Sequence, residues 1–241
     1  MTRRRFFAPP SAFNFNKRTV TLTADEARHL REVLRLKPGD EVSVFDGEGK
    51  EFRARVAQAR RDFAELELVE EMAPARPESP LQITLAVALL KGEKFDLVVQ
   101  KATELGVTSI VPLMTQHADI RLRDESDASK RVARWQRIAL EAAKQSGRAF
   151  VPEVSLPVAV SLVLSERCLL FSERGGTELR QIETDEITAI IGSEGGWSDE
   201  ELDQARAAGA QIVTLGGRIL RAETAAITAA ALLQHRFGDL K

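Results

Sequence analysis

The sequence predicts an α/β protein in which a small β-rich domain precedes a larger domain built on a mostly parallel sheet. Three observations lead to this class: short alternating patterns fill the first 70 or so residues, residues 72–80 hold three prolines, and apolar runs then alternate with helical patterns. Alternation of strands and helices is typical of parallel sheets, because a crossover helix returns the chain to the same edge. We therefore expect domains at residues 1–72 and 81–241, joined by a linker at 73–80.

The first domain is expected to hold one helix and several short strands. Thr23 and Glu26 have the spacing of a capping box, so they predict a helix that begins at Thr23, and Gly39 predicts its end. The glycine-rich residues 46–49 predict a hairpin turn. Apolar and polar residues alternate, as in half-buried strands, at 41–45, 52–56 and 63–69. Such strands favour a small barrel.

The second domain carries five apolar runs of strand length, at residues 81–90, 109–113, 168–171, 187–192 and 211–215. Helices are expected between them, on both faces of the sheet. The first spans Phe95 to Leu105, and Lys94 and Lys101 are expected on its solvated face. The second follows a cap at Ser126 or Asp127. The third begins with the capping box at 198–201, and the last covers about 221–236.

Positive charge gathers at the N-terminal end, although the net charge of the chain is only −2. Residues 1–37 hold nine Lys and Arg against three Asp and Glu, an excess of six positive charges. Such a cluster is suited to neutralising phosphates, and a solvated surface is the alternative interpretation.

Several classes of protein lose support from the composition. No apolar run approaches the roughly 18–20 residues of a membrane span, and no signal-peptide pattern is present. Cys168 is the only cysteine, which excludes a disulfide within the chain and indicates a reducing, cytoplasmic setting. The three histidines lack metal-ligand spacing. We expect a cytoplasmic protein with no membrane partner and no metal.

Two glycine-containing segments near the C-terminus, residues 192–197 and 215–225, predict a ligand pocket. Each follows an apolar strand and leads into a helix, so the two junctions would present backbone amides to one ligand. The alternatives are an ordinary tight turn for the first segment and a plain helix start for the second. The basic residues beside the second glycine pair would suit an anionic substrate.

Common nucleotide and hydrolase motifs are absent around these segments. Gly92 is a lone glycine where a dinucleotide-binding loop would need three, and no P-loop pattern occurs. Ile191 occupies the position where a nucleophile elbow around Ser193 would require glycine. Ordinary nucleotide hydrolysis and serine-hydrolase chemistry therefore lose support.

Five motifs, in order, resemble a known family. They lie at residues 28–35, 101–107, 141–148, 191–196 and 215–225, and together they resemble the bacterial 16S ribosomal RNA uridine-N3 methyltransferases (the RsmE type) of the SPOUT superfamily. The resemblance covers nearly the whole chain. It implies a PUA-like β-barrel that binds RNA, a SPOUT domain whose parallel sheet holds a trefoil knot, S-adenosylmethionine as the cofactor in that knot, and a homodimer.

The resemblance also implies roles for individual residues. The implied catalytic residues are Arg221 and Glu223. The implied cofactor-binding residues are Leu170, Phe171, Glu173, Gly192, Glu194, Gly195, Gly196, Leu215, Gly216, Ile219, Leu220 and Thr224, and the RNA-binding ones are Arg3, Arg4, Arg5, Arg28, Arg31 and Arg35. The chain departs from the family at Ser193, where proline is common, and at residues 115–119, where an Arg-Ser pair is common.

Methyl transfer to uridine N3 requires an aligned donor and an exposed pairing edge, so the target base is expected in a single strand or outside its stack. Arg221 would hold a phosphate or stabilise charge on the uracil oxygens, and Glu223 is a candidate base or a structural carboxylate. The proton acceptor stays unassigned. Two alternatives remain: a related enzyme acting on another RNA such as transfer RNA, and a non-catalytic RNA-binding factor for ribosome assembly.

Overall fold

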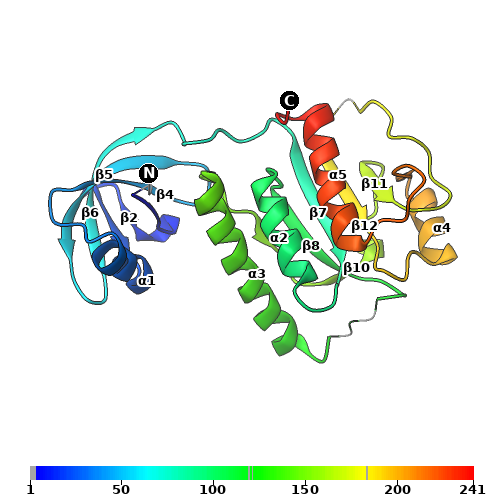
Figure 1. The fold of residues 1–241 in the computed structure, drawn as a ribbon, viewed down its shortest axis with the longest axis horizontal. Helices are drawn as coiled ribbons and strands as arrows, with labels where there is room; N and C mark the ends of the chain where they lie inside the picture. Colours follow the sequence, from blue (N-terminus) through cyan, green and yellow to red (C-terminus); the bar gives the residue numbers. More distant parts are fainter. Residues whose placement is uncertain (1–3, 119, 121, 183) are drawn as a thin grey trace. The chain divides into compact units, whose positions relative to one another are not determined.

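The computed structural model describes residues 4–118, 120, 122–182 and 184–241, and its chain divides into two compact units (Figure 1). The first is Met1–Glu78 with Ala143–Val151, and the second is Ser79–Ala142 with Pro152–Lys241. No helix or strand occurs between residues 73 and 81. The α/β class, with a separate β-rich unit before a parallel sheet, is confirmed. The return of residues 143–151 to the first unit is a long-range association that no local pattern indicates.

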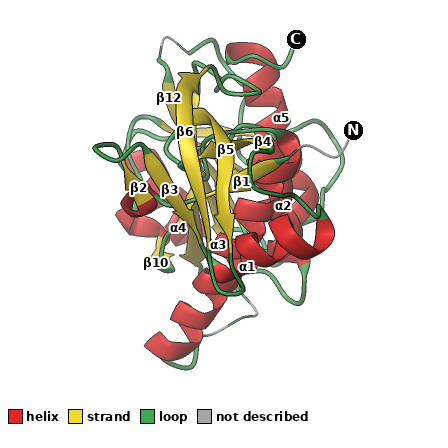
Figure 2. Ribbon diagram, turned by 90° about the vertical axis from the view of Figure 1, so that its left-hand side faces the viewer, coloured by secondary structure: helices red, strands yellow, loops and turns green. Residues whose placement is uncertain are grey.

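The first unit is built on a six-stranded sheet in the order β1-β4-β5-β6-β3-β2. Only β1 and β4 are parallel, and the long strands β5 and β6 run next to each other in Figure 2. The three predicted strands are present, and three further strands flank them. The bounds are Arg5–Phe7 (β1), Phe13–Asn14 (β2), Thr19–Leu22 (β3), Glu41–Phe45 (β4), Glu51–Ala59 (β5) and Ala64–Met72 (β6).

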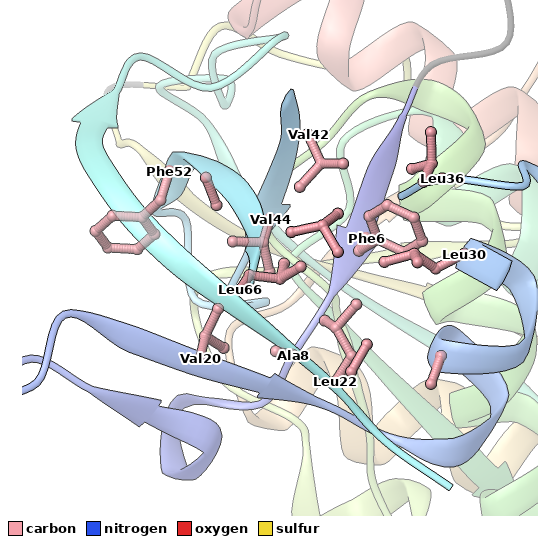
Figure 3. Packing of buried hydrophobic residues seen from close by; sticks show 14 of the residues in the cluster. Phe6, Ala8, Val20, Leu22, Leu30, Leu36, Val42, Val44, Phe52 and Leu66 are labelled. Carbon is pink, nitrogen blue, oxygen red and sulfur yellow. The ribbon is translucent and has the colours of Figure 1, made fainter. Parts of the chain in front are cut away.

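The core of this unit lies on one side of the sheet, where alternate strand residues are apolar. Figure 3 shows Phe6, Val44 and Leu66 from three strands gathered with Leu30 from the helical segment. The hairpin predicted at residues 46–49 is confirmed, since β4 and β5 pair antiparallel with Phe45 opposite Glu51.

The capping box predicted at Thr23 is wrong, because Thr23 makes no side-chain cap hydrogen bond. Glu26 instead accepts a hydrogen bond of 2.7 Å from Lys144, and this largely buried ion pair occupies its carboxylate. The helix α1, Ala24–Arg28, continues as a π-helical turn over His29–Val33. It ends before Arg35, whose φ of 52° breaks the helix ahead of the predicted stop at Gly39.

The second unit holds a parallel sheet in the order β10-β8-β7-β12-β11-β13, with β9 also paired to β8. The five predicted apolar runs are confirmed as β7, β8, β11, β12 and β13, and the two short strands β9 and β10 were not predicted. The bounds are Gln82–Ala88 (β7), Ser109–Met114 (β8), Glu153–Val154 (β9), Val158–Ala159 (β10), Cys168–Phe171 (β11), Glu186–Ile191 (β12) and Gln211–Val213 (β13).

Four helices accompany this sheet: α2 (Lys94–Glu104), α3 (Glu125–Ser146), α4 (Asp199–Ala207) and α5 (Ala222–Phe237). Leu202 of α4 packs in one core with Leu170 and Ile190, which project from one face of the sheet. α5 contacts β7 and β12 and packs on α2, and Figure 1 shows α2 and α5 in front of the sheet.

Two helix starts of the second unit were predicted from caps, with different outcomes. The capping box of α4 is confirmed: Ser198 Oγ accepts from the Glu201 amide at 3.1 Å, and Glu201 accepts from the Ser198 amide at 3.0 Å. The cap predicted at Ser126 or Asp127 is wrong. Asp124 fills this role, since its carboxylate accepts from the Asp127 amide at 2.8 Å and α3 begins one residue later.

Candidate functional site

A pocket of about 300 Å³ lies where β11, β12 and β13 end. Parallel strands bring their carboxyl ends to one edge of the sheet, where ligands of α/β proteins commonly bind. Three loops and the start of α5 form the walls. Ten of the residues predicted to bind the cofactor line this pocket: Phe171, Glu173, Gly192, Glu194, Gly195, Gly196, Leu215, Gly216, Ile219 and Leu220.

The first glycine segment follows β12 and packs closely against neighbouring residues. A Cβ on Gly192 would lie 2.9 Å from the Trp197 ring, and one on Gly195 would lie 2.8 Å from Cβ of His117. Trp197 donates a hydrogen bond of 2.8 Å to the carbonyl of Phe171, which ties the loop to β11. Only glycine permits this close approach of the backbone.

The second glycine segment follows β13 and is open. A Cβ on Gly216 or Gly217 would meet no atom within 4 Å, and the φ of Gly216 is +65°. Ile219 is 85% exposed although it also lines the pocket. The hydroxyl of Thr214, another lining residue that the sequence did not indicate, is buried and has no hydrogen-bond partner among the described residues. This side of the pocket is thus shaped by backbone and apolar side chains that a ligand would cover.

Four of the predicted catalytic and cofactor-binding residues lie outside the pocket lining. Leu170 is fully buried in the core that packs on α4, and Thr224 is exposed in the first turn of α5. Arg221 is exposed at the N-cap of α5, and Glu223 is largely buried in the first turn. Arg221 and Glu223 flank Ala222, which does line the pocket. Their predicted roles stay predictions.

Lys94 lies near the pocket and pairs with carboxylates there, so its predicted place on a solvated helix face is wrong. Its ammonium group contacts the carboxylate of Glu194 and lies 3.7 Å from a carboxylate oxygen of Glu223. It therefore joins the start of α2 to two segments at the pocket and is not a merely solvated lysine. The partners lie about 100 residues or more further along the chain, so no local pattern could have revealed them. Lys101, by contrast, pairs with Glu104 on its own helix at 2.9 Å.

The segment after β8, where the chain departs from the family pattern, lies against the first glycine segment. The carbonyl of His117 accepts a hydrogen bond of 3.0 Å from Ser193, and the Gln116 amide donates to Glu201 at 2.9 Å. Residues 115–118 therefore support the pocket loop from behind, and Asp119 lies outside the described residues.

Arg5, predicted to contact RNA, is a structural residue. Its side chain and that of Glu51 are 4% and 2% exposed, and they form two hydrogen bonds of 2.9 and 3.2 Å. Arg5 also donates to the carbonyl of Arg148 at 2.8 Å and lies 3.9 Å above the Phe45 ring. The burial of this guanidinium leaves it no surface for a phosphate, which corrects the prediction.

The pKa of Glu51 is lower than that of an ordinary glutamate. Burial of the carboxyl raises its pKa, but hydrogen bonds from Arg5 and from the Ala75 amide, together with the charge of Arg5, lower it by more. Glu51 is therefore held as a carboxylate.

The other predicted RNA-binding arginines differ in how available they are. Arg28 and Arg35 are exposed, and Arg4 is half-exposed beside Asp40 at 3.4 Å. Arg31 is partly occupied, since it donates to the carbonyl of Arg60 at 2.8 Å and pairs with Glu32 at 2.6 Å. Arg3 lies outside the described residues.

The described ranges contain neither a candidate metal site nor a candidate membrane span. No group of three or more His, Cys, Asp or Glu side chains could hold a metal ion there. Among those same residues, no helix combines the length and apolarity that crossing a membrane demands.

Comparison with known proteins defines the class first. The family described as RNA methyltransferase domain matches residues 77–234, and the family described as RNA methyltransferase PUA domain matches residues 22–69. The fold and pocket described above therefore belong to an RNA methyltransferase domain with an N-terminal PUA domain.

Relatives carry one more specific name. The ribosomal RNA small subunit methyltransferase E of Synechocystis sp. is 39% identical over 226 residues, which cover 88% of this chain and 72% of that protein. Its namesake in Rickettsia conorii is 32% identical over 223 residues and 88% of both chains. The chain belongs to the ribosomal RNA small subunit methyltransferase E family.

Solved structures agree in fold over the whole chain. The ribosomal RNA small subunit methyltransferase E of Neisseria gonorrhoeae, bound to S-adenosyl methionine, has a TM-score of 0.87 at 38% identity and covers 99% of this chain and 100% of its own. A methyltransferase of Legionella pneumophila, in complex with the same cofactor, has a TM-score of 0.87 at 31% identity, with 100% of both chains covered.

Proposed function

We propose that the protein uses S-adenosylmethionine to methylate a specific uridine at N3 in 16S ribosomal RNA of the small ribosomal subunit. The observation that carries this proposal is the pocket at the ends of β11, β12 and β13, formed by glycine segments within an RNA methyltransferase domain. The Neisseria and Legionella structures, which bind S-adenosylmethionine and match nearly the whole chain, support the choice of cofactor.

The residues of the pocket fit this cofactor. A volume of about 300 Å³ lies at the lower end of ligand pockets. Ile191, Leu220 and Ala225 offer apolar surface for an adenine ring, and the open backbone at Gly216 and Gly217 leaves amides for its polar edge and for the ribose. Glu173 and Glu194 are the carboxylates in the lining, and they suit hydroxyl or ammonium groups.

When bound, S-adenosylmethionine supplies a methyl group activated by a sulfonium charge. The protein must hold the uracil N3 in line with that methyl group, because alignment supplies a large part of the rate enhancement. A bond forms between N3 and the methyl carbon as the bond between sulfur and that carbon breaks, and the proton of N3 leaves to an acceptor. Arg221, at the N-cap of α5, is the residue proposed to stabilise charge on the uracil oxygens or to hold a phosphate, and Glu223 is the carboxylate nearest to it in sequence.

We propose further that the loops of the second unit form a trefoil knot and that two copies of the chain pair. β11 lies between β12 and β13, so the chain crosses back past β11 after leaving β12, an order compatible with a knot. Leu97 on α2 and Leu232 on α5 are about 40% exposed, and the two helices pack together, which suits an apolar contact between subunits. The buried Cys168 is compatible with work in the cytoplasm.

The test is methylation by the purified full-length protein with radiolabelled S-adenosylmethionine. Free 16S ribosomal RNA, assembled small subunits and transfer RNA serve as separate substrates, and mass spectrometry locates the modified base. We expect one N3-methyluridine, in 16S ribosomal RNA only. Methylation of transfer RNA alone would favour the related enzyme, and a calorimetric titration without binding of S-adenosylmethionine would favour the non-catalytic assembly factor.

A further inference from the structure

Lys94 joins three segments that come from distant parts of the sequence. It lies at the start of α2, its ammonium group contacts Glu194 in the glycine segment after β12, and it lies 3.7 Å from Glu223 in the first turn of α5. Glu194 lines the pocket, and Glu223 follows the lining residue Ala222. The Lys94 side chain thus connects the glycine segment after β12 with the first turn of α5.

Burial and charge strengthen the interaction of Lys94 with Glu223. The side chains of Lys94 and Glu223 are 28% and 13% exposed, so their interaction is less screened than that of a surface pair. The Lys94 ammonium group contacts Glu194 and lies near Glu223, so its positive charge reduces the repulsion between these two carboxylates at the edge of the pocket. Lys94 therefore sets how closely these two segments approach.

Glu223 keeps one oxygen uncommitted. Its Oε2 atom is buried and has no hydrogen-bond partner among the described residues. A buried acceptor without a donor is costly, so such a group calls for a donor from outside the chain. The imide N–H of a uracil ring is a donor of this kind.

We infer that Lys94 is a positioning residue for methyl transfer, which acts by holding Glu223 in place beside the bound uracil. The inference rests on the proposed function, since it assigns a role at the same site. Lys94 acts through the Glu223 carboxylate and not on the substrate itself. Its removal is expected to impair the chemical step more than the binding of the cofactor, because misplacement of a group at the reacting centre lowers kcat.

The test compares Lys94→Met and Lys94→Arg with the matched control Lys101→Met on the same helix. We expect Lys94→Met to lower kcat about 10- to 100-fold and to change the Kd of S-adenosylmethionine less than about threefold. Lys94→Arg, which keeps the charge, should recover most of kcat. Lys101→Met should behave as the wild type, because Lys101 pairs within its own helix. An unchanged kcat in Lys94→Met, or a loss confined to cofactor binding, would overturn the inference.

A double-mutant cycle separates positioning from general stability. If Lys94 acts through Glu223, the variant Lys94→Met with Glu223→Gln should be no slower than Glu223→Gln alone. Multiplicative losses would contradict this pathway. Should Lys94→Met fail to fold, Lys94→Gln replaces it, and a kcat equal to that of the wild type would again overturn the inference. A wild-type protein without methylation activity would refute the proposed function, whereas an active wild type with an equally active Lys94→Met refutes only the role of Lys94.

Discussion

Gly217 is the position where a substitution is best suited to change the shape of the pocket without disturbing the fold. A Cβ there would meet no described atom within 4 Å and the backbone is not in the left-handed region, so we expect substitution to leave the fold intact. Gly196 is less suitable, since its φ of +71° strains any other residue and its Cβ would lie 3.1 Å from Glu173. The two positions both line the pocket, but only one of them reports on the pocket alone.

We expect Gly217→Val to weaken binding of S-adenosylmethionine at least about tenfold, because the added side chain occupies ligand space. The affinity of Gly217→Ala should lie between those of the wild type and Gly217→Val. Calorimetry measures the affinity, and thermal unfolding checks that Tm stays near the wild-type value. Wild-type affinity in Gly217→Val with an unchanged Tm would show that this loop does not contact the cofactor.

Arg5 illustrates how a basic residue in a basic segment becomes structural. Truncating it leaves the buried Glu51 without its partner, and breaking such a pair costs about 3–5 kcal/mol. Arg4→Ala is the matched control, since its exposed pair with Asp40 is worth about 0–1 kcal/mol. We expect urea unfolding to separate the two variants by at least about 2 kcal/mol.

The lowered pKa of Glu51 adds a pH dependence to this comparison. A carboxyl whose pKa is lower in the folded state stabilises the protein above the unfolded pKa of about 4.3, and this contribution is lost as the pH falls through the folded pKa. The difference in unfolding free energy between wild type and Arg5→Ala should therefore shrink as the pH falls from about 7 toward 3. A difference that stays constant over this range would contradict the role of the ion pair.

At the scale of elements, the N-terminus of α4 connects local capping to the pocket. Glu201 completes the capping box with Ser198 and also accepts from the Gln116 amide, in the segment that supports the glycine loop. Ser198→Ala removes only the cap, and we expect a loss of about 1 kcal/mol in unfolding free energy. Glu201→Ala should cost more and should also speed hydrogen exchange at the Gln116 amide. Equal exchange at Gln116 in both variants would mean that Glu201 does not anchor that segment.

At the scale of the whole molecule, the first unit is expected to supply charge for RNA and the second the chemistry. Arg28 and Arg35 are exposed; Arg28 lies 3.5 Å from the exposed Asp25 on its own helix, and Arg35 has no ion-pair partner in the part of the chain that the structure describes. We expect Arg28→Ala with Arg35→Ala to weaken RNA binding and to reduce the slope of log Kd against log salt by about one for each lost phosphate contact.

Arg53→Ala with Arg55→Ala is the matched control for this experiment. These exposed arginines of the same unit pair with Glu70 and Glu41, so their loss should change the salt slope less. Filter binding to 16S ribosomal RNA over a range of salt concentrations measures both variants. Equal slopes for the two pairs would place the RNA contacts elsewhere on the protein.

The elements were predictable where local sequence decides them. Period-two and period-3.6 patterns located the strands of the parallel sheet and the helices, and the Ser198 capping box needs only neighbouring residues. The prediction at Thr23 failed because Glu26 is taken by Lys144, 118 residues away. Short edge strands such as β2 and β10, of two residues each, carry too few positions to show a pattern.

The sequence by itself determined the class of fold, the two glycine segments and, by family resemblance, most of the residues that line the pocket. Only the tertiary structure decided which charged residues are free to act. Arg5 is buried against Glu51, and Lys94 contacts Glu194 and lies near Glu223, although nothing in the neighbouring sequence of these five residues indicates their partners. The physical reason is that a charge takes its role from burial and from its nearest partners, and folding brings those partners from about 50 to 130 residues away.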